Sequence, residues 1–253
     1  MYINAYMSKF FISIDQGTTS SRAVLYNSSF DQLSQEQKEF KQYYPAEGLV
    51  EHDPEEIWRS VFETTKSLMA KNEVKSEDII SIGITNQRET IMLWDNKGKV
   101  LDKAIVWQDR RTAKYCEELK SKGLEKIITE KTGLLLDPYF SASKARWLIN
   151  KHKVDPKKYF FGTIDTFLVW KLTQGKAFKT DITNASRTSL LNIDLGIWDE
   201  ELLDIFELRG LNLPEVTKNA SDFGTTKIFG GKIRISGVAG DQQASLIGQG
   251  CFS

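Results

Sequence analysis

The stretch from residue 10 to residue 22 constrains this chain most, because an apolar run ends at a carboxylate and turns through a loop rich in hydroxyl groups. Residues 10–14 predict a buried strand, Gly17 a tight turn, and residues 23–26 a second strand that returns beside the first. The tip of this hairpin carries the hydroxyl groups of Thr18, Thr19, Ser20 and Ser21. Such a tip can bind phosphate oxygens, although an ordinary polar hairpin has the same composition.

The composition indicates a folded protein without a nucleic-acid or membrane partner. With 253 residues, 40% of them hydrophobic, the chain can form one large domain or two small ones. Lysine and arginine number 34, as do aspartate and glutamate, so no net charge attracts a polyanion. Cys116 and Cys251 lie far apart, which argues against a disulfide framework or a structural metal. Without a membrane-length apolar run or a secretory signal, we expect a cytoplasmic enzyme domain.

The next elements predict a sheet that begins antiparallel and continues parallel. Residues 33–40 predict a third antiparallel strand. A helix is expected to begin at Pro54, with Asp53 as its N-cap and Glu56 completing a capping box. After this crossover helix, residues 79–84 predict a buried parallel strand. Ligands of open α/β sheets bind beyond the carboxyl ends of such strands, so we expect a site in the segment that follows.

The rest of the chain alternates between short strands and helices, which predicts an α/β fold. A strand that ends in glycine is followed by Asp241 at the start of a helix, and Asp165 is expected to cap another helix. Residues 173–190 predict a polar loop region. Further strands are expected at 90–94, 105–107, 159–164 and 233–240, and helices at 110–122, at 124–150 with breaks at Gly133 and at residues 137–138, and at 198–208.

Residues 15–22, Asp-Gln-Gly-Thr-Thr-Ser-Ser-Arg, resemble the first phosphate loop of the actin-like ATPase superfamily. More narrowly, they resemble the opening signature of the FGGY carbohydrate kinases, and among these the glycerol kinases. Supporting segments of the same pattern are TNQRET at 85–90, VWQDRRT at 106–112, DPYFSASK at 137–144, TNASRT at 183–188 and GVAGDQQA at 237–244. The resemblance covers almost the whole chain. It implies an actin-like, ribonuclease H-like fold with a mixed β-sheet flanked by helices.

The resemblance implies ATP-dependent phosphorylation of glycerol to sn-glycerol 3-phosphate, with Mg²⁺ as the metal. Asp241 is then the catalytic base, and Asp15 orients the magnesium ion through water. These two acids must therefore face a common crevice. The implied phosphate-binding residues are Thr18, Thr19, Ser20 and Arg22.

The resemblance also implies a glycerol site. Arg88 and Glu89 would hold two hydroxyl groups, Trp107 would pack on the carbon face, and Tyr139 would contact glycerol through its hydroxyl group. Gln242, Thr18 and Asp241 complete the implied substrate contacts. From the residues alone, plainer interpretations stay open: surface charge for the Arg-Glu pair, a core position for the tryptophan, a turn position for the tyrosine, and an N-cap for Asp241.

The family resemblance leaves part of the machinery outside this chain. Family members are longer and carry a second actin-like domain, and no adenine pocket, P-loop or protein-kinase glycine loop is recognisable here. We therefore predict that residues 1–253 are the N-terminal, substrate-binding domain of a longer kinase and are poorly active alone. The expected partners are glycerol and the C-terminal nucleotide-binding domain, and a homo-oligomer is left open.

Two alternatives to glycerol phosphorylation also stay open. One is a kinase for another polyol or sugar of the same family, and the other is a truncated domain that binds a ligand without turnover.

Residues 227–234 form a shorter loop than the one that binds fructose 1,6-bisphosphate in regulated bacterial members, so we do not expect inhibition by that sugar phosphate. His52 and His152 lie outside every matching segment, and we expect structural or surface roles for both.

Overall fold

A six-stranded mixed sheet forms the centre of the computed structural model, which describes residues 9–251. The strand order is β14-β15-β6-β1-β2-β3. The pairs β1·β2 and β2·β3 are antiparallel, whereas β6 pairs in parallel with both β1 and β15, which confirms the predicted arrangement. The strands are β1 (Phe10–Gln16), β2 (Ser20–Asn27), β3 (Gln32–Glu39), β6 (Ile79–Asn86), β14 (Thr225–Thr226) and β15 (Ile233–Gly240).

The helix α1 (Pro54–Lys71) covers one face of this sheet. Alternate residues of β1 point to opposite faces of the sheet. Ile12 and Ile14 are buried in the same apolar cluster as Ile57 of α1. Each such side chain contributes about 1.5–3 kcal/mol through burial. The opposite face of β1 carries Ser13 and Asp15, which are only partly buried. The sheet therefore has an apolar face toward α1 and a polar face that is available to ligands.

The start of α1 follows the prediction only in part. Asp53 is the N-cap, and its Oδ1 accepts hydrogen bonds from the backbone N–H groups of Glu55 and Glu56. The predicted capping box is wrong, because Glu56 Oε1 accepts from the Tyr43 hydroxyl group at 2.8 Å and Oε2 is buried without a partner. A tertiary contact has taken over the side chain that the local motif would use.

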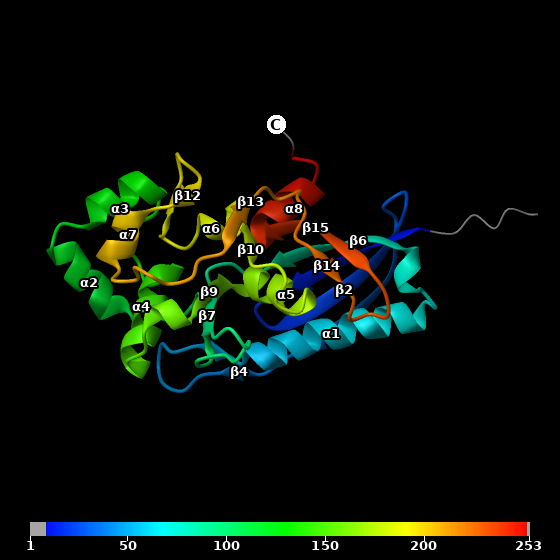
Figure 1. Ribbon diagram of the computed structural model, residues 1–253, viewed down its shortest axis with the longest axis horizontal. Coiled ribbons are helices and arrows are strands. Elements are labelled where there is room, and N and C mark those ends of the chain that lie inside the picture. Colours follow the sequence, from blue (N-terminus) through cyan, green and yellow to red (C-terminus); the bar gives the residue numbers. More distant parts are fainter. Residues whose placement is uncertain (1–8, 252–253) are drawn as a thin grey trace, which may run out of the picture.

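The other end of the molecule holds a five-stranded sheet of order β4-β5-β8-β7-β9 and a second apolar core (Figure 1). Four helices gather there, and Leu148, Phe161 and Phe206 are among the side chains buried between them and the sheet. The elements are β4 (Gln42–Tyr43), β5 (Glu51–His52), β7 (Ile91–Trp94), β8 (Ala104–Ile105), β9 (Phe160–Thr163), α2 (Ala113–Ser121), α3 (Glu125–Thr132), α4 (Ser141–His152) and α7 (Glu200–Ile205).

The region between the two sheets corrects two predictions. Residues 173–190 are not a plain loop, because they contain a strand and a short helix that pack against the central sheet. Asp165 is not an N-cap, since Thr163 holds that position and the Asp165 carboxylate is fully buried. The remaining elements are α5 (Ile164–Leu172), β10 (Lys179–Asp181), α6 (Ile182–Ala185), β11 (Leu191–Asn192), β12 (Ile197–Trp198), β13 (Glu215–Thr217), α8 (Asp241–Gly248), and the 3₁₀ helices η1 (Ser76–Asp78) and η2 (Pro156–Lys158).

The parallel register brings three strand ends to one edge of the central sheet. Gln16 of β1 and Gly240 of β15 both lie opposite Asn86 of β6. The segments that follow these strands therefore share an edge, although they are far apart in the sequence. Within residues 9–251, none of the helices combines the length and apolarity that a membrane crossing requires.

Candidate functional site

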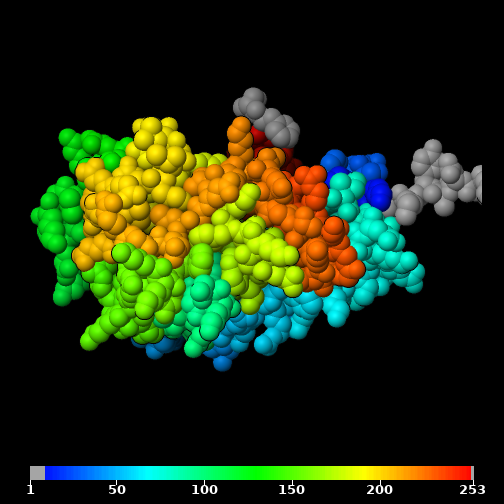
Figure 2. Space-filling model, in the orientation of Figure 1, coloured from blue at the N-terminus to red at the C-terminus, as the bar shows by residue number. Residues whose placement is uncertain are grey.

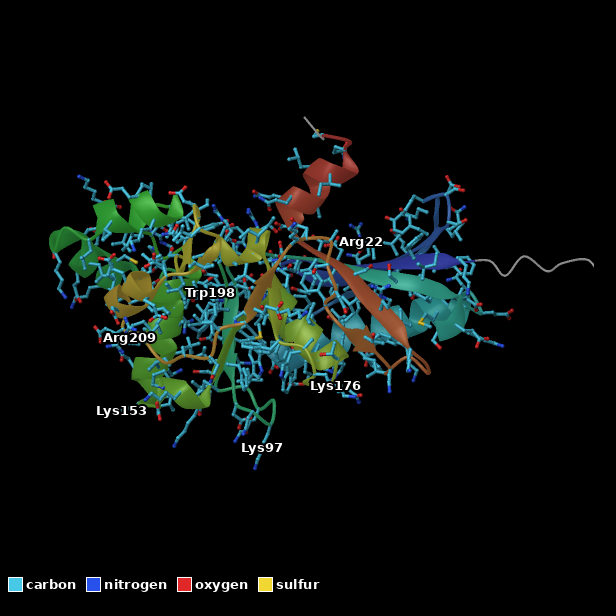
Figure 3. The ribbon with its side chains drawn as sticks, turned by 45° about the horizontal axis from the view of Figure 1, so that its top comes forward. Arg22, Lys97, Lys153, Lys176, Trp198 and Arg209 are labelled. Atoms are coloured by element: carbon cyan, nitrogen blue, oxygen red, sulfur yellow. The ribbon has the colours of Figure 1, made fainter. Side chains whose placement is uncertain are left out.

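A crevice of about 460 Å³ opens on the face of the central sheet that lies opposite α1. Asp15 and Asp241 both line it, which confirms the prediction that these two acids face a common space. Because β6 lies between β1 and β15, their backbones are separated by roughly 10 Å. The other lining residues are Ser13, Arg22, Val24, Tyr26, Thr85, Ala244, Ser245, Gly248 and Gln249. In Figure 3, Arg22 is labelled close to α8, the helix that forms the far wall of this crevice.

The hairpin tip places a charged pair at the mouth of this crevice. Asp15 lies opposite Arg22 in the β1·β2 register, and an Arg22 nitrogen donates to Asp15 Oδ2 at 2.6 Å. The two side chains are 30% and 44% exposed, so the pair adds little to stability and both groups remain open to a ligand. The hydroxyl group of Ser20 accepts from Gln37, while Thr19 is exposed.

A buried arginine contacts the other acid of the crevice. Arg88 follows β6, its side chain is 4% exposed, and its Nε lies 3.4 Å from Asp241 Oδ1. This Nε makes no hydrogen bond within residues 9–251. A Cβ atom on Gly240 would lie only 2.3 Å from Arg88 Cδ. The glycine before Asp241 is therefore required by the close passage of the arginine side chain.

Glu89, the neighbour of Arg88, is buried and held in an unusual backbone conformation. Its φ angle is +60°, and Thr90 N donates to Arg88 O at 2.7 Å, so Glu89 forms the centre of a three-residue γ-turn. Such backbone strain costs on the order of 1–3 kcal/mol and is concentrated at functional sites. Burial raises the pKa of Glu89, whereas the hydrogen bond from Arg187 Nε, at 2.7 Å, and the charge of Arg88 lower it.

Two aromatic residues complete the cluster. Trp107 Nε1 donates to Thr18 Oγ1 at 3.1 Å, and the Trp107 and Tyr139 ring centroids are 5.5 Å apart. Burial raises the pKa of Tyr139, and the nearby charges of Glu89 and Asp241 raise it further, while two arginines act in the opposite direction. Tyr139 therefore lies close both to Trp107 and to the charged groups. The structure brings together the predicted residues Thr18, Arg88, Glu89, Trp107, Tyr139 and Asp241.

Among the predicted substrate contacts, Gln242 is the residue that this arrangement does not bring into the cluster. It is exposed in the first turn of α8, and its amide side chain makes no hydrogen bond to the described part of the chain. The next residue, Gln243, is half-buried, and its Oε1 is shielded from solvent without a hydrogen-bond partner. The helical turn thus presents one glutamine to solvent and the other to the protein.

Two residues of the cluster carried no assigned role in the sequence. Arg187 donates to Glu89 across 98 positions, and its guanidinium group lies 4.9 Å from the Phe140 ring centroid and 5.9 Å from that of Tyr139. Lys144 is fully buried and donates to the carbonyl groups of residues 138–140, the loop that presents Tyr139. Burial lowers the pKa of Lys144 to about 7. Both residues lie in segments that match the family pattern, but only the three-dimensional contacts reveal what they hold.

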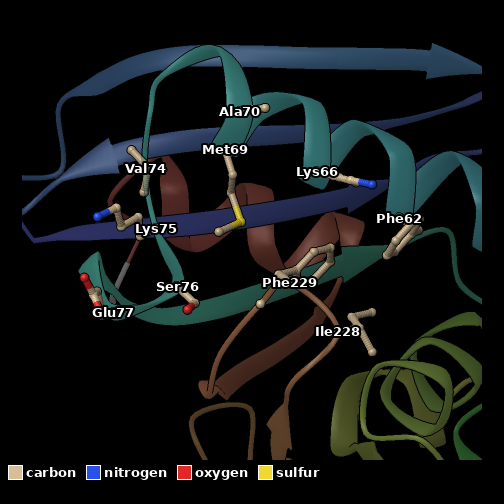
Figure 4. A pocket seen from close by; sticks show the side chains of 11 residues that line it. Phe62, Lys66, Met69, Ala70, Val74, Lys75, Ser76, Glu77, Ile228 and Phe229 are labelled. Atoms are coloured by element: carbon tan, nitrogen blue, oxygen red, sulfur yellow. The ribbon is translucent and has the colours of Figure 1, made fainter.

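A larger hollow, of about 550 Å³, lies on the α1 side of the sheet (Figure 4). Phe62 and Met69 of α1 and Phe229 from the β14–β15 connection are among its lining residues, and none of the predicted site residues lines it. Figure 2 shows these orange-red and cyan segments side by side at the surface. This hollow is thus separate from the crevice.

The two histidines have structural environments. His52 is fully buried, with its Nε2 2.5 Å from Gln42 Oε1, and burial lowers its pKa to about 4. His152 Nε2 lies 2.8 Å from Asp102 Oδ2 at the surface of α4.

Within residues 9–251, no three His, Cys, Asp or Glu side chains gather as a metal site would require. Magnesium held together with substrate phosphates needs only one or two carboxylates, so Asp15 at the crevice fits that ion.

Comparisons with known proteins agree with this geometry. Residues 10–248 match the model of the FGGY family of carbohydrate kinases, N-terminal domain. Glycerol kinase of Sinorhizobium fredii is 53% identical over 254 residues, which cover 97% of this chain and 51% of that protein. Plasmodium falciparum glycerol kinase, solved with ADP, superposes with a TM-score of 0.87 at 36% identity, over 97% of this chain and 51% of that one. Gluconate kinase of Lactobacillus acidophilus superposes with a TM-score of 0.86 at 26% identity, over 94% and 49% of the two chains.

These matches confirm the predicted fold class, the actin-like ATPase fold with a mixed sheet flanked by helices. The chain spans about half the length of the curated relatives it matches. With the family model covering nearly all of the described residues, the chain belongs to the FGGY family of carbohydrate kinases.

Proposed function

We propose that residues 1–253 form the glycerol-binding domain of a longer kinase that transfers the γ-phosphoryl group of ATP to glycerol, giving sn-glycerol 3-phosphate. The observation that carries this proposal is the cluster of Arg88, Glu89, Trp107 and Tyr139 beside Asp241, at the edge where the parallel strands end. The identity to relatives named glycerol kinase supports glycerol as the substrate.

The chemistry of the cluster suits a small polyol. Each hydroxyl group of glycerol both donates and accepts hydrogen bonds, so it needs an acceptor such as Glu89 and a donor such as Arg88. Both side chains are buried, which strengthens their interaction with a bound hydroxyl group relative to water. Trp107 and Tyr139 offer apolar ring surface for the carbon chain. Gln242 would join the site only after a change in the conformation of its exposed side chain.

Asp241 is proposed as the base that accepts the proton of the attacking hydroxyl group. It lines the crevice, and the neighbouring Arg88 lies within 3.4 Å and holds the carboxylate next to the polyol site. Phosphoryl transfer depends chiefly on alignment and on neutralisation of charge. A single acid between the polyol cluster and the crevice meets the requirement for alignment.

The hairpin tip is proposed to hold the phosphate groups of ATP. Arg22 would supply positive charge, and the hydroxyl groups of Thr18, Thr19 and Ser20 would supply hydrogen bonds. Asp15, which forms an ion pair with Arg22, would bind magnesium through water. When bound, magnesium neutralises negative charge on the phosphate groups.

A second domain is proposed to complete the nucleotide site. Leu246 and Ile247 of α8 are 55% and 50% exposed, directly beside crevice residues on the same helix. Exposed apolar side chains at the mouth of a site are typical of a surface that another domain covers. This placement supports a C-terminal, nucleotide-binding partner domain, which agrees with a chain that spans about half of its relatives.

The proposal is tested by coupled ADP release with MgATP and a panel of glycerol, other polyols and sugars. The full-length gene product should turn over glycerol in preference to the others, whereas residues 1–253 alone should be far slower. Asp241→Asn should abolish turnover and retain glycerol binding, because the base is lost and the polyol contacts remain. Preference for a sugar would identify a different family member, and a full-length protein that binds glycerol with no turnover would support a binding module instead.

A further inference from the structure

A buried carboxylate, Asp181, lies at the centre of a hydrogen-bond network between β10 and α6. It is fully buried and is the N-cap of α6. Its Oδ2 accepts from Thr183 N at 2.7 Å, from Thr183 Oγ1 at 2.5 Å and from Asn219 Nδ2 at 2.7 Å. Its Oδ1 accepts from Asn184 Nδ2 at 2.6 Å and from Asn184 N at 3.3 Å. Within residues 9–251 no lysine or arginine pairs with this carboxylate, so neutral donors alone satisfy it.

One arm of the network reaches the end of β15. Gly240 N donates to Thr183 Oγ1 at 2.8 Å, and this same hydroxyl group donates to Asp181. Asn219 Nδ2 bridges the Asp181 carboxylate to the carbonyl group of Val238, at 3.1 Å. Gly240 has no side chain, so besides its pairing with β6 this N–H group attaches it to the rest of the protein just before Asp241.

The other arm reaches the end of β6. The side-chain amides of Asn184 and Asn86 hydrogen-bond to each other in both directions, at 2.9 and 3.0 Å, and both residues are fully buried. Asn86 Nδ2 also donates to Gln87 O, the carbonyl group that immediately precedes Arg88. Asp181 in turn accepts from the Asn184 amide that contacts Asn86. A single carboxylate is thus connected to two strand ends, through Thr183 and Asn219 to β15 and through Asn184 to β6.

We propose that Asp181 is a positioning residue that fixes the separation of Arg88 and Asp241. It holds the end of β15 through Thr183 and the end of β6 through Asn184, and both of these residues belong to α6. This inference rests on the proposed function, in which Asp241 is the base and Arg88 binds the polyol. A hydroxyl cap would satisfy fewer of the five donors, whereas a carboxylate has about four lone-pair sites on two oxygens and can reach both arms. Small displacements of a reacting group cost large factors in rate, which gives the network a catalytic effect without substrate contact.

The neighbouring acid Asp165 affects the charge of Asp181. It is fully buried and accepts from the hydroxyl groups of Thr163 and Thr180. Burial and then the charge of Asp181 raise the pKa of Asp165 to about 7. Burial raises the pKa of Asp181 as well, but its hydrogen bonds from Thr183 and Asn184 lower that pKa. Asp181 accepts more hydrogen bonds than Asp165, which favours Asp181 as the ionised member of the pair. The pair can therefore keep a charged acceptor at the centre of the network while Asp165 takes up a proton.

Matched threonine variants test the inference. Thr183→Val removes the hydroxyl group between Asp181 and Gly240 with little change in volume, and Thr183→Ser restores it. Thr180→Val is the control, because it also deletes a buried hydroxyl group that donates to an aspartate, at 2.7 Å, but one without a link to Gly240. The readouts are amide hydrogen exchange of Gly240 in residues 1–253 and the kcat and KM for glycerol of the full-length protein.

We expect Thr183→Val to speed Gly240 exchange at least about tenfold and to lower kcat by about 10- to 100-fold. Thr183→Ser should restore both, and Thr180→Val should retain kcat even where it lowers the melting temperature as much. Equal loss of kcat in Thr180→Val and Thr183→Val would overturn the inference, as would unchanged Gly240 exchange in Thr183→Val. If the unaltered full-length protein shows no glycerol-dependent ADP release, the proposed function fails, and Gly240 exchange still decides whether the network fixes this strand end.

Discussion

At the scale of single residues, two buried charged side chains lie where the polyol is proposed to bind. Glu89 is 2% exposed and is held by Arg187, while Arg88 is almost as deeply buried and faces Asp241. A buried charge that loses its partner costs more than the pair contributes, so each of these groups depends on its neighbour. Arg187 stands out because it contacts both the carboxylate and the Tyr139 side of the cluster.

Arg187→Met should weaken glycerol binding by about 10- to 100-fold, because the hydrogen bond that orients Glu89 is charge-assisted. Isothermal titration of the chain with glycerol measures this. Arg187→Lys is the matched control: it retains the positive charge but not the planar donor, so its affinity should lie between the two. Unchanged affinity in Arg187→Met would show that Glu89 needs no help from this arginine.

His52 predicts a dependence of stability on pH. Burial lowers its pKa from 6.5 to about 4, so the unfolded chain binds a proton more readily than the folded chain between these values. Stability from this residue is therefore present above about pH 6.5 and is lost as the pH falls toward 4, by about 3 kcal/mol in all. Urea unfolding at several pH values should show a flatter profile for His52→Gln than for the unaltered chain. Parallel profiles would contradict this account.

At the scale of elements, the sequence predicted those parts whose signals are local. The hairpin at residues 10–27, the helix after Asp53 and the strands ending at Asn86 and Gly240 all follow from apolar runs and turn residues. The strand and helix within residues 173–190 were missed, because they are very short and polar and owe their form to the Asp181 network.

For the candidate site too, the sequence predicted the residues whose signals are local. Residues directly after buried strands, such as Arg88 and Asp241, could be placed because parallel strand ends share an edge. Arg187 could not, since its contact with Glu89 spans 98 positions and no periodic pattern encodes it.

The end of β15 gives a steric prediction. In Gly240→Ala the new methyl group would lie 2.3 Å from Arg88 Cδ and 2.8 Å from Cγ, so the arginine side chain must move. Gly240 has a φ of −58°, which alanine also adopts, so backbone strain does not enter. Glycerol affinity should fall at least about tenfold, since the displaced guanidinium group is the proposed polyol donor. Gly83→Ala in β6, where a Cβ meets nothing within 4 Å, is the control and should bind as the unaltered chain does.

At the scale of the whole molecule, two apolar cores support one functional edge. One core lies between α1 and the central sheet, and the other lies among the helices at the far end. The crevice with Asp15 and Asp241 belongs to the central sheet, whereas Tyr139 and Trp107 come from the second sheet's side of the molecule. The hydrogen bond from Trp107 to Thr18 joins the two parts at the site. Leu246 and Ile247 of α8, which are exposed, lie at the same edge.

The most direct test of this account is the ¹H–¹⁵N signal of the Trp107 indole during a glycerol titration of the labelled chain, assigned with Trp107→Phe. The indole N–H donates to Thr18 beside the proposed polyol site, so the signal should shift saturably. The shift should disappear in Glu89→Gln at the same glycerol concentrations. A Trp107 signal that stays in place at saturating glycerol, in a chain whose other signals show the native fold, would contradict the claim that this cluster binds the substrate.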